Sequence, residues 1–491
     1  MLYNSFAFLV FFAAVLVIFY TTAMPLRGRF PAWTLLAASL FFYGYYSMTF
    51  LALLLCSAGV SYAVCRKIRS LRDSPAHKKR WLWLGIGLNV LSLGYFKYYI
   101  FIATNLALAG LPLPIYKIAL PLGISFYTFQ QIAYIVDTYK SDVCEEDFWE
   151  YLLFITYFPR LISGPIVRRE EVMPYLRSPE RQTALYIKVG LTLFVLGMGK
   201  KLLIADSFAV WADAIFNAAD AGTSLTTFEA WAGALAYTIQ IYFDFSGYSD
   251  MAIGVSTMLG VPLPVNFASP YKSLNIVDFW RRWHITLSKW LRDYIYIPLG
   301  GNRCAPWRRY GNAFVTMLVG GIWHGANWTF ILWGAMHGIL QMIYQLWAAH
   351  PANKDRIPRH VAILITFFCI VMTWIPFRSA TWAGAMQVFA ACFSFTGGVG
   401  TLLADPFAVV FWTVAGFLVV RFAPNTNEML SGTVIFTPSR SYPATTPAAP
   451  QGGWAFMHWR DSRAWAAVTG GIFALCVMKF FSNATYIYFQ F

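Results

Sequence analysis

The sequence predicts an all-α, polytopic membrane protein with about eleven transmembrane helices, together with re-entrant and interfacial helices. Of its 491 residues, 58% are hydrophobic and only 12% are charged, whereas about 25% of the residues in a soluble domain are charged. Apolar runs of spanning length recur along the whole chain, and most Lys and Arg residues lie between them. These observations exclude a soluble enzyme with a single anchor and favour one multi-pass domain over residues 1–491.

The first predicted span, 5–22, comes before the first charged residue, Arg27. A cleaved secretory signal carries positive charge ahead of its apolar run, so this span is expected to be retained. The other predicted spans are 32–47, 49–64, 81–108, 115–136, 148–166, 184–204, 228–243, 310–349 (more than one pass), 361–377, 405–420 and 464–481. Shorter pieces at 206–219, 247–263 and 379–396 are expected to be re-entrant or interfacial, and 422–462 to be a polar loop.

The basic segment 65–80, CRKIRSLRDSPAHKKR, carries seven Lys or Arg and one Asp. The positive-inside rule makes this segment cytoplasmic, places Arg27 and Arg29 on the same side, and puts the N-terminus outside. The net charge of +15 is then explained by topology and anionic membrane lipid, and nucleic-acid binding is not expected. The seven cysteines form neither a disulfide framework nor a zinc spacing, so they are expected to be packing residues and no metal is expected.

The run 310–353 holds 44 residues without a Lys, Arg, Asp or Glu. As one helix it would be about 66 Å long, roughly twice the hydrocarbon thickness, so it must break. The break is predicted at GGIWHGAN (320–327), because glycine weakens helices and asparagine favours caps. Non-helical backbone at membrane depth is tolerated only inside the protein or beside a cavity. His324 is therefore expected at a buried break and His337 on the helix that follows.

Glycines 334 and 338 form a GxxxG pair, which favours close helix packing.

The segment 279–299, FWRRWHITLSKWLRDYIYIPL, is predicted to form one amphipathic interfacial helix. Its apolar stripe consists of Trp280, Trp283, Leu287, Trp290 and Tyr294. Anchoring at the membrane surface explains the Trp and Arg residues. His284 lies between the stripes, where an imidazole could reach both a cavity and water.

The stretch 239–250 contains Asp244 and Asp250 among aromatic residues. A carboxylate at the bilayer centre costs about 2.5–3.5 kcal/mol, so both are expected to face the bundle interior. They are interpreted as structural, either paired with an Arg of 281–292 or capping a helix.

The chain lacks the motifs of serine, zinc and phosphate-loop enzymes, which leaves histidine as the candidate general base. A neutral imidazole in a desolvated pocket can take the proton of an alcohol that attacks an activated acyl group. Tryptophan N–H groups such as that of Trp323, the amide of Asn327 or backbone N–H groups could stabilise the oxyanion. The alternative is a packed, hydrogen-bonded histidine. A histidine at a glycine-rich break between aromatic residues, with a second histidine, His284, forty positions earlier, favours the functional interpretation.

Several long motifs occur together: LPLGISFYTFQQIAYIVDTYK (120–140), FWRRWHITLSKWLRDYIYIPLGG (279–301) and WHGANWTFILWGAMHG (323–338). Together they resemble the membrane-bound O-acyltransferases. YFPRLISGPIVRREE (157–171) and the terminal YIYFQF resemble the bacterial alginate O-acetyltransferase branch of that family. The likeness covers about residues 90–350 and the C-terminus, and it implies helices around a central tunnel.

The resemblance implies that His324 is the catalytic histidine, with His284 assisting and His337 in a supporting role. Arg281, Arg282 and Arg292 are then weak candidates for holding the donor's phosphates. The resemblance further implies a cytoplasmic donor, acetyl-CoA, with no permanently bound cofactor. The expected partners are a periplasmic serine-esterase-like acetyltransferase of the SGNH type and the exopolysaccharide machinery of a bacterial inner membrane.

Three alternatives stay open. The same motifs are compatible with D-alanyl transfer from a carrier protein toward teichoic acid. A transporter or exporter could use the histidines to relay protons, although no internal repeat is detectable. A non-catalytic scaffold for the periplasmic enzyme is the third alternative.

Overall fold

The computed structural model describes residues 1, 3–26, 28–111, 113–179, 183–353, 356–433 and 452–480. Within these ranges the chain forms helices joined by loops and by short 3-10 and π-helical turns, with no β-strand. The predicted all-α class is therefore confirmed. Arg27 and the terminal YIYFQF, which entered the sequence predictions, lie outside the described residues.

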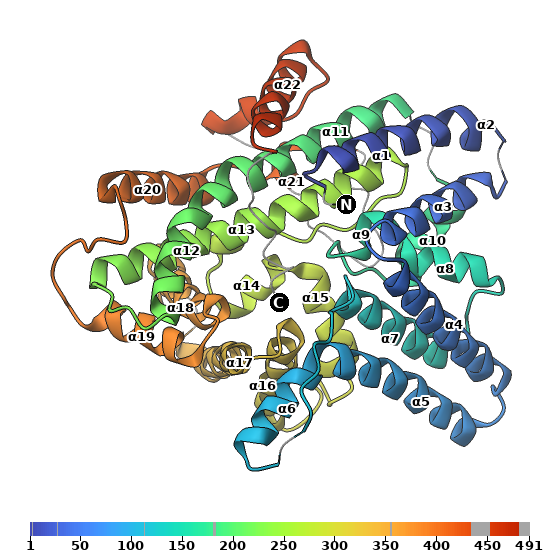
Figure 1. Ribbon diagram of the computed structural model, residues 1–491, viewed down its shortest axis with the longest axis horizontal. Helices are drawn as coiled ribbons and strands as arrows, with labels where there is room; N and C mark the ends of the chain where they lie inside the picture. The colour runs from blue at the N-terminus through green and yellow to red at the C-terminus, as the bar shows by residue number, and fades with distance from the viewer. Residues whose placement is uncertain are drawn as a thin grey trace.

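Most helices from the first third of the chain gather at one end of the molecule, drawn at the right of Figure 1, whereas α6 lies at its lower centre. Their bounds are α1 (Phe6–Ile18), α2 (Met24–Leu26), α3 (Phe30–Gly44), α4 (Met48–Ser70), α5 (Pro75–Leu93), α6 (Tyr99–Leu108), α7 (Ile124–Ser141), α8 (Phe148–Thr156), α9 (Phe158–Leu161) and α10 (Arg169–Arg177). Within this group α4, α5 and α7 contact one another, and α3 contacts α8.

The remaining helices complete the molecule, with α14 to α17 at its centre (Figure 1). Their bounds are α11 (Thr183–Gly199), α12 (Asp206–Asp220), α13 (Thr227–Met258), α14 (Ile276–Arg282), α15 (Ile285–Leu291), α16 (Pro306–His324), α17 (Trp328–Ala348), α18 (Arg359–Arg378), α19 (Trp382–Phe393), α20 (Pro406–Phe422), α21 (Thr426–Met429) and α22 (Arg463–Met478).

Glycines allow α11 and α13 to pack backbone against backbone. A Cβ placed on Gly190 would lie 2.7 Å from the carbonyl oxygen of Gly254, and one placed on Gly197 would lie 2.6 Å from that of Gly247. The predicted separation of 228–243 from 247–263 is therefore wrong. Gly247 and Gly254 do not interrupt the helix but let it approach α11, and α13 is one helix from Thr227 to Met258.

Among the described residues, four helical stretches are long and apolar enough to cross a membrane: Phe6–Leu26, Met48–Ser70, Pro75–Leu108 and Arg359–Arg378. Shorter apolar helices are Phe30–Gly44, Trp382–Phe393, Pro406–Phe422 and Arg463–Met478. The count of about eleven spans stays a prediction.

Two predicted spans are not continuous helices. In 115–136, helix begins only at Ile124, after a loop that contains Pro114 and Pro121. In 148–166, α8 ends at Thr156 and is followed by the four-residue α9 and an irregular turn. Proline lacks a backbone N–H and disfavours helix at the residue before it, which accounts for the first interruption. At the second, Tyr157 leaves the helical region with φ −48° and ψ 106°. Of the predicted polar loop 422–462, only 422–433 and 452–462 are described, and they hold α21 and a short 3-10 turn.

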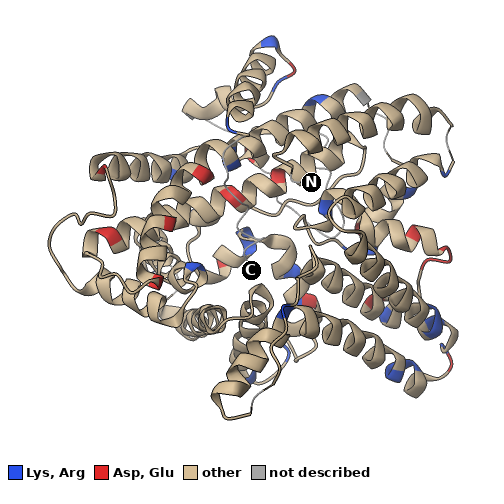
Figure 2. Cartoon of the chain, viewed as in Figure 1, with Lys and Arg blue, Asp and Glu red and all other residues tan. Residues whose placement is uncertain are grey.

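A network of ion pairs ties the α4–α5 turn to neighbouring elements, and we call the end of the molecule that holds it the charged end. Its pairs are Arg29–Asp147, Arg69–Glu146, Lys78–Asp142, and Glu145 with both Arg169 and Arg177. Figure 2 shows Lys and Arg at this end of α4 and α5. The basic segment of the sequence prediction therefore lies at the charged end.

Asp244 and Asp250 are buried inside the molecule, as predicted. The prediction that they pair with an arginine of 281–292 is wrong. Lys201 pairs with Asp244 at 2.7 Å, and Lys200 pairs with Asp250 at 2.6 Å. Both lysines lie on a π-helical turn, Lys200–Ala205, which runs beside α13 and brings their ammonium groups to it.

Candidate active site

The helix break that carries His324 lies within the predicted segment but is shorter than expected. Helix α16 ends at His324, and Gly325 has an extended backbone with φ −163° and ψ 154°. Asn327 then caps α17 by accepting a hydrogen bond from the Thr329 N–H at 3.2 Å. The Asn327 amide also donates to the carbonyl of Ala380 at 2.7 Å. Both ends of this side chain therefore serve the fold, and we assign it no role with substrate.

Glycines 320 and 321 remain helical rather than forming part of the break. A Cβ on Gly321 would lie 2.5 Å from the carbonyl oxygen of Phe330, and one on Gly334 would lie 2.8 Å from that of Met317. The close packing predicted for Gly334 and Gly338 is confirmed, since a Cβ on Gly338 would lie 2.7 Å from the Phe314 ring. These contacts hold α16 and α17 together on either side of the turn.

The prediction of a single amphipathic helix at 279–299 is wrong. Helix α14 ends at Arg282 and α15 begins at Ile285, with His284 between them in a left-handed conformation of φ 43° and ψ 53°. Two backbone bonds hold this break against a neighbouring loop, from Ile285 N–H to Asn266 and from Ala268 N–H to Arg282, both 3.0 Å long. A non-glycine residue in this conformation costs about 1–3 kcal/mol, and such strain clusters at functional sites.

Interfacial anchoring by this segment is also wrong, because its tryptophans are buried inside the protein. Trp280, Trp283 and Trp290 are each 7% exposed or less. The Trp290 ring stacks on Phe129 with centroids 3.6 Å apart. The segment is an internal element at the centre of the molecule.

Asn266 fixes the tautomer of His284. Its Oδ1 accepts from the Thr286 N–H at 3.2 Å and from the Thr286 hydroxyl at 3.0 Å, and its Nδ2 donates to Ser249. A backbone N–H can only donate, so the atom that faces it is the amide oxygen. The same oxygen lies 3.1 Å from His284 Nδ1, which must therefore carry a proton. In the neutral ring, Nε2 then holds the lone pair that a general base needs.

His337 has the opposite tautomer. Trp280 Nε1–H donates to His337 Nδ1 at 3.2 Å. Since an indole N–H is only a donor, Nδ1 holds the lone pair and the proton of the neutral ring is on Nε2. The imidazole is fully buried, so His337 fits a supporting role better than that of a base.

Two tryptophan rings connect the three histidines. Trp323 lies next to both His324 and His284, with ring centroids 5.0 and 6.4 Å away. Trp333 lies next to both His324 and His337, with centroids 4.9 and 4.6 Å away. The structure therefore brings together all three histidines that the sequence singled out, around a shared aromatic cage with His324 in the middle.

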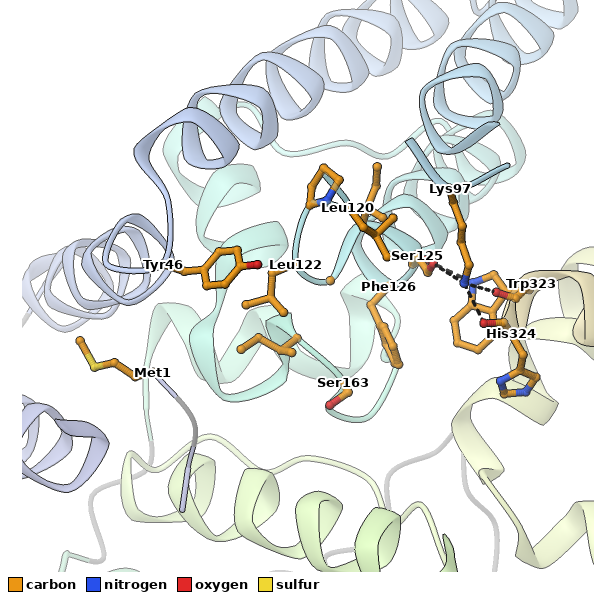
Figure 3. A pocket seen from close by; sticks show the side chains of 14 residues that line it. Met1, Tyr46, Lys97, Leu120, Leu122, Ser125, Phe126, Ser163, Trp323 and His324 are labelled. Carbon is orange, nitrogen blue, oxygen red and sulfur yellow. Dashed lines mark hydrogen bonds between the residues drawn. The ribbon is translucent and has the colours of Figure 1, made fainter. Parts of the chain in front are cut away.

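A pocket of about 350 Å³ leads to His324. Figure 3 shows it extending from Met1 and Tyr46 at one side to Lys97, Trp323 and His324 at the other. Its wall is formed largely by the segment 120–126 that precedes and begins α7. His324 is a buried residue, 5% exposed, at the inner end of this pocket.

Comparison with known proteins agrees with this arrangement. Residues 40–380 match the family model of the membrane-bound O-acyltransferases. The chain belongs to the membrane-bound O-acyltransferase family. It is 41% identical to a peptidoglycan O-acetyltransferase of Helicobacter pylori, over 81% of this chain and 80% of that protein. It is also 41% identical to the probable alginate O-acetylase of Pseudomonas putida, over 80% of this chain and 81% of that protein.

A teichoic acid D-alanyltransferase of Streptococcus thermophilus is less similar, at 29% identity over 52% of this chain and 68% of that protein. The chain is therefore an O-acyltransferase of a membrane family, and it is more similar to these acetyltransferases than to this D-alanyltransferase. The residues that perform the transfer in this chain stay a prediction, which the aromatic cage supports.

The three arginines proposed to hold the donor are divided by the break at His284 in this O-acyltransferase. Arg281 is exposed at the end of α14, where Arg282 pairs with Asp278 at 2.9 Å. Arg292 lies beyond the break, on the turn after α15, and pairs with Asp293 at 2.8 Å. Lys289, which the sequence prediction passed over, pairs with Glu171 near this turn.

Sequence reasoning missed two residues of the site, Asn266 and Lys97. Lys97 is the one charged residue between 81 and 116, and a charge inside an apolar span is by itself a functional signal. Asn266 carried no comparable signal, because its neighbours in VPLPVNFASP do not show that it faces His284.

Proposed function

We propose that this O-acyltransferase takes an acetyl group from acetyl-CoA on the cytoplasmic side and transfers it toward an acceptor on the opposite side. The product serves O-acetylation of an exported polysaccharide such as alginate or cellulose. The observation that carries the proposal is the pocket that leads to His324 from the side opposite the charged end.

The direction follows from helix α4. The pocket residue Tyr46 lies in the turn before α4, and the basic α4–α5 turn follows its other end. The 23 residues of α4 span roughly 34 Å, about the thickness of the hydrocarbon core. If the basic turn is cytoplasmic, as the positive-inside rule requires, the pocket opens outside the cell, where an acceptor arrives. The proposed location is a bacterial inner membrane with the N-terminus outside.

The chemistry needs one base. The acceptor hydroxyl oxygen bonds to the acetyl carbon while His324 takes the hydroxyl proton. The thioester C–S bond then breaks, and the proton passes to the leaving thiolate to give free CoA and an acetyl ester. His284, whose lone pair is on Nε2, assists or positions His324. Acetyl-CoA acts as a substrate here, and no permanently bound cofactor is proposed.

The relatives support acetyl as the acyl group. The two acetyltransferases cover about four fifths of the chain at 41% identity, and the D-alanyltransferase covers about half at 29%. The polymers in the names of these two relatives, peptidoglycan and alginate, differ, so the polymer is the part that experiment must identify. The proposed partners are membrane lipid, the exopolysaccharide machinery, and a periplasmic SGNH-type acetyltransferase that passes the group to the polymer.

The decisive experiment replaces His324 with alanine in the producing strain. Alkali-labile acetyl is measured on the exported polysaccharide and on peptidoglycan, with the membrane abundance of the protein checked alongside. We expect H324A to abolish acetylation of one polymer while its export continues. The matched control is His360→Ala, since His360 is exposed at the start of α18 and its loss should change nothing.

Other outcomes point to other functions. Normal acetylation with normal abundance would make the chain a scaffold, and lost export with normal acetylation would make it a transporter. Loss of alkali-labile D-alanine with acetyl unchanged would favour D-alanyl transfer, which labelled acetyl-CoA and a labelled D-alanyl carrier protein would separate directly.

A further inference from the structure

Lys97 is a charged residue at the pocket that neither the motifs nor the histidine chemistry explain. It lies on a π-helical turn, Gly94–Tyr98, between α5 and α6. Such turns are rare and often mark functional sites, because the extra residue redirects the side chains that follow. Figure 3 shows the Lys97 side chain extending to Trp323 and His324.

The ammonium group of Lys97 holds the end of α16. It donates to the carbonyl oxygens of Trp323 at 2.7 Å and His324 at 2.8 Å, and to the Ser125 hydroxyl at 3.3 Å. The last carbonyls of a helix have no partner within it, and they form the negative end of the helix dipole. Lys97 therefore satisfies two of these carbonyls and neutralises the helix end directly at the residue that carries the candidate base.

The charge of Lys97 is not cancelled by an acid. None of the ion pairs among the described residues includes it, and the carbonyls it contacts bear only partial charges. It is also the only Lys or Arg among the residues that line the pocket, none of which is acidic. Among the lining residues, Lys97 is therefore the Lys or Arg side chain that can place an ammonium group at the base of the pocket.

We propose that Lys97 is a positioning residue for the acyl transfer. It fixes the last turn of α16, and with it the His324 imidazole, and it places an ammonium group at the base of the pocket. The tetrahedral intermediate of the transfer is negatively charged, so a fixed positive charge beside it lowers the barrier. The proposal rests on the function proposed above, and it adds a residue that holds the base and sets the charge of the pocket.

The test uses membrane vesicles from the expressing strain, so that the chain keeps its own acceptor. Release of CoA from acetyl-CoA is measured against donor concentration for wild type, Lys97→Met, Lys97→Arg and Lys97→Cys, each normalised to protein abundance. Loss of one electrostatic donor typically costs about 10²–10³ in kcat. We expect a loss of that size in K97M with an unchanged KM for acetyl-CoA, and partial recovery in K97R.

Chemical rescue separates charge from folding. Treating K97C with 2-bromoethylamine rebuilds an ammonium group at nearly the same reach, whereas iodoacetamide adds a neutral group of similar size. We expect only the first reagent to restore activity, and neither to affect wild type. Lys188→Met is the control, because Lys188 forms an exposed pair with Asp461.

Each result decides one of the two proposals. A K97M rate equal to that of wild type, or equal recovery of K97C with both reagents, would overturn the role of Lys97 and leave the acetyl transfer intact. Wild-type vesicles that release no more CoA than vesicles without the chain would instead overturn the proposed function.

Discussion

Replacing Asn266 with alanine removes the four hydrogen bonds that hold the His284 break, with lengths of 3.0–3.2 Å. A side-chain hydrogen bond inside a membrane protein contributes about 0.6 kcal/mol on average, and one in a soluble protein about 1 kcal/mol. The sum is about 2–4 kcal/mol. Donors left without an acceptor raise this cost, whereas relaxation of the strained His284 backbone lowers it. We expect N266A to lower the free energy of unfolding by about 2–4 kcal/mol.

The loss of activity in N266A should exceed what reduced abundance explains, because no acceptor then keeps the proton on His284 Nδ1. The assay is thermal unfolding of the detergent-solubilised protein, together with CoA release normalised to folded protein. Asn266→Asp keeps an oxygen at this position and should retain more activity than N266A. The control Asn353→Ala removes a single bond to the Trp347 carbonyl. Wild-type melting and activity in N266A would refute this account of the break.

Three further predictions concern packing and charge. Gly321→Val should destabilise the protein by about 1–3 kcal/mol, because its Cβ would meet the α17 backbone. A Cβ on Gly311 meets nothing within 4 Å, so G311V is the control. Equal melting temperatures of G321V and G311V would contradict this prediction. The Arg160 side chain is fully buried, and its guanidinium nitrogens have no hydrogen-bond partner among the described residues. R160M should therefore be neutral or up to about 4 kcal/mol more stable, and a lower melting temperature would count against this. A hydrogen bond from Lys78 holds the pKa of Asp142 below its ordinary value. The stability this pair supplies is therefore present above about pH 4 and is lost as the pH falls through the lowered pKa; D142N should melt below wild type at pH 7 but not in acid, and a gap that persists in acid would contradict this.

The sequence predicted what depends on composition and local pattern. The apolar runs predicted the helical class. The length of the uncharged run 310–353 required a break, and its glycines and Asn327 placed that break near His324. Breaks held by distant contacts could not be predicted. His284 adopts its conformation because Asn266 and a backbone segment eighteen residues earlier in the chain bind it, while its own neighbours form a regular helical pattern. Asp244 and Asp250 were correctly expected to be buried, but their lysine partners come from another helix.

The glycine contacts between α11 and α13 have a mechanical consequence. The two backbones touch at Gly190 with Gly254 and again at Gly197 with Gly247. Neither helix can slide along the other without a collision, so the two helices form one rigid unit. The break at His284 is supported by this pair of helices, because its ring packs against Phe245 of α13 and Asn266 donates to Ser249 of α13. Enlarging either glycine pair should therefore disturb the His284 break as well as the packing of the two helices.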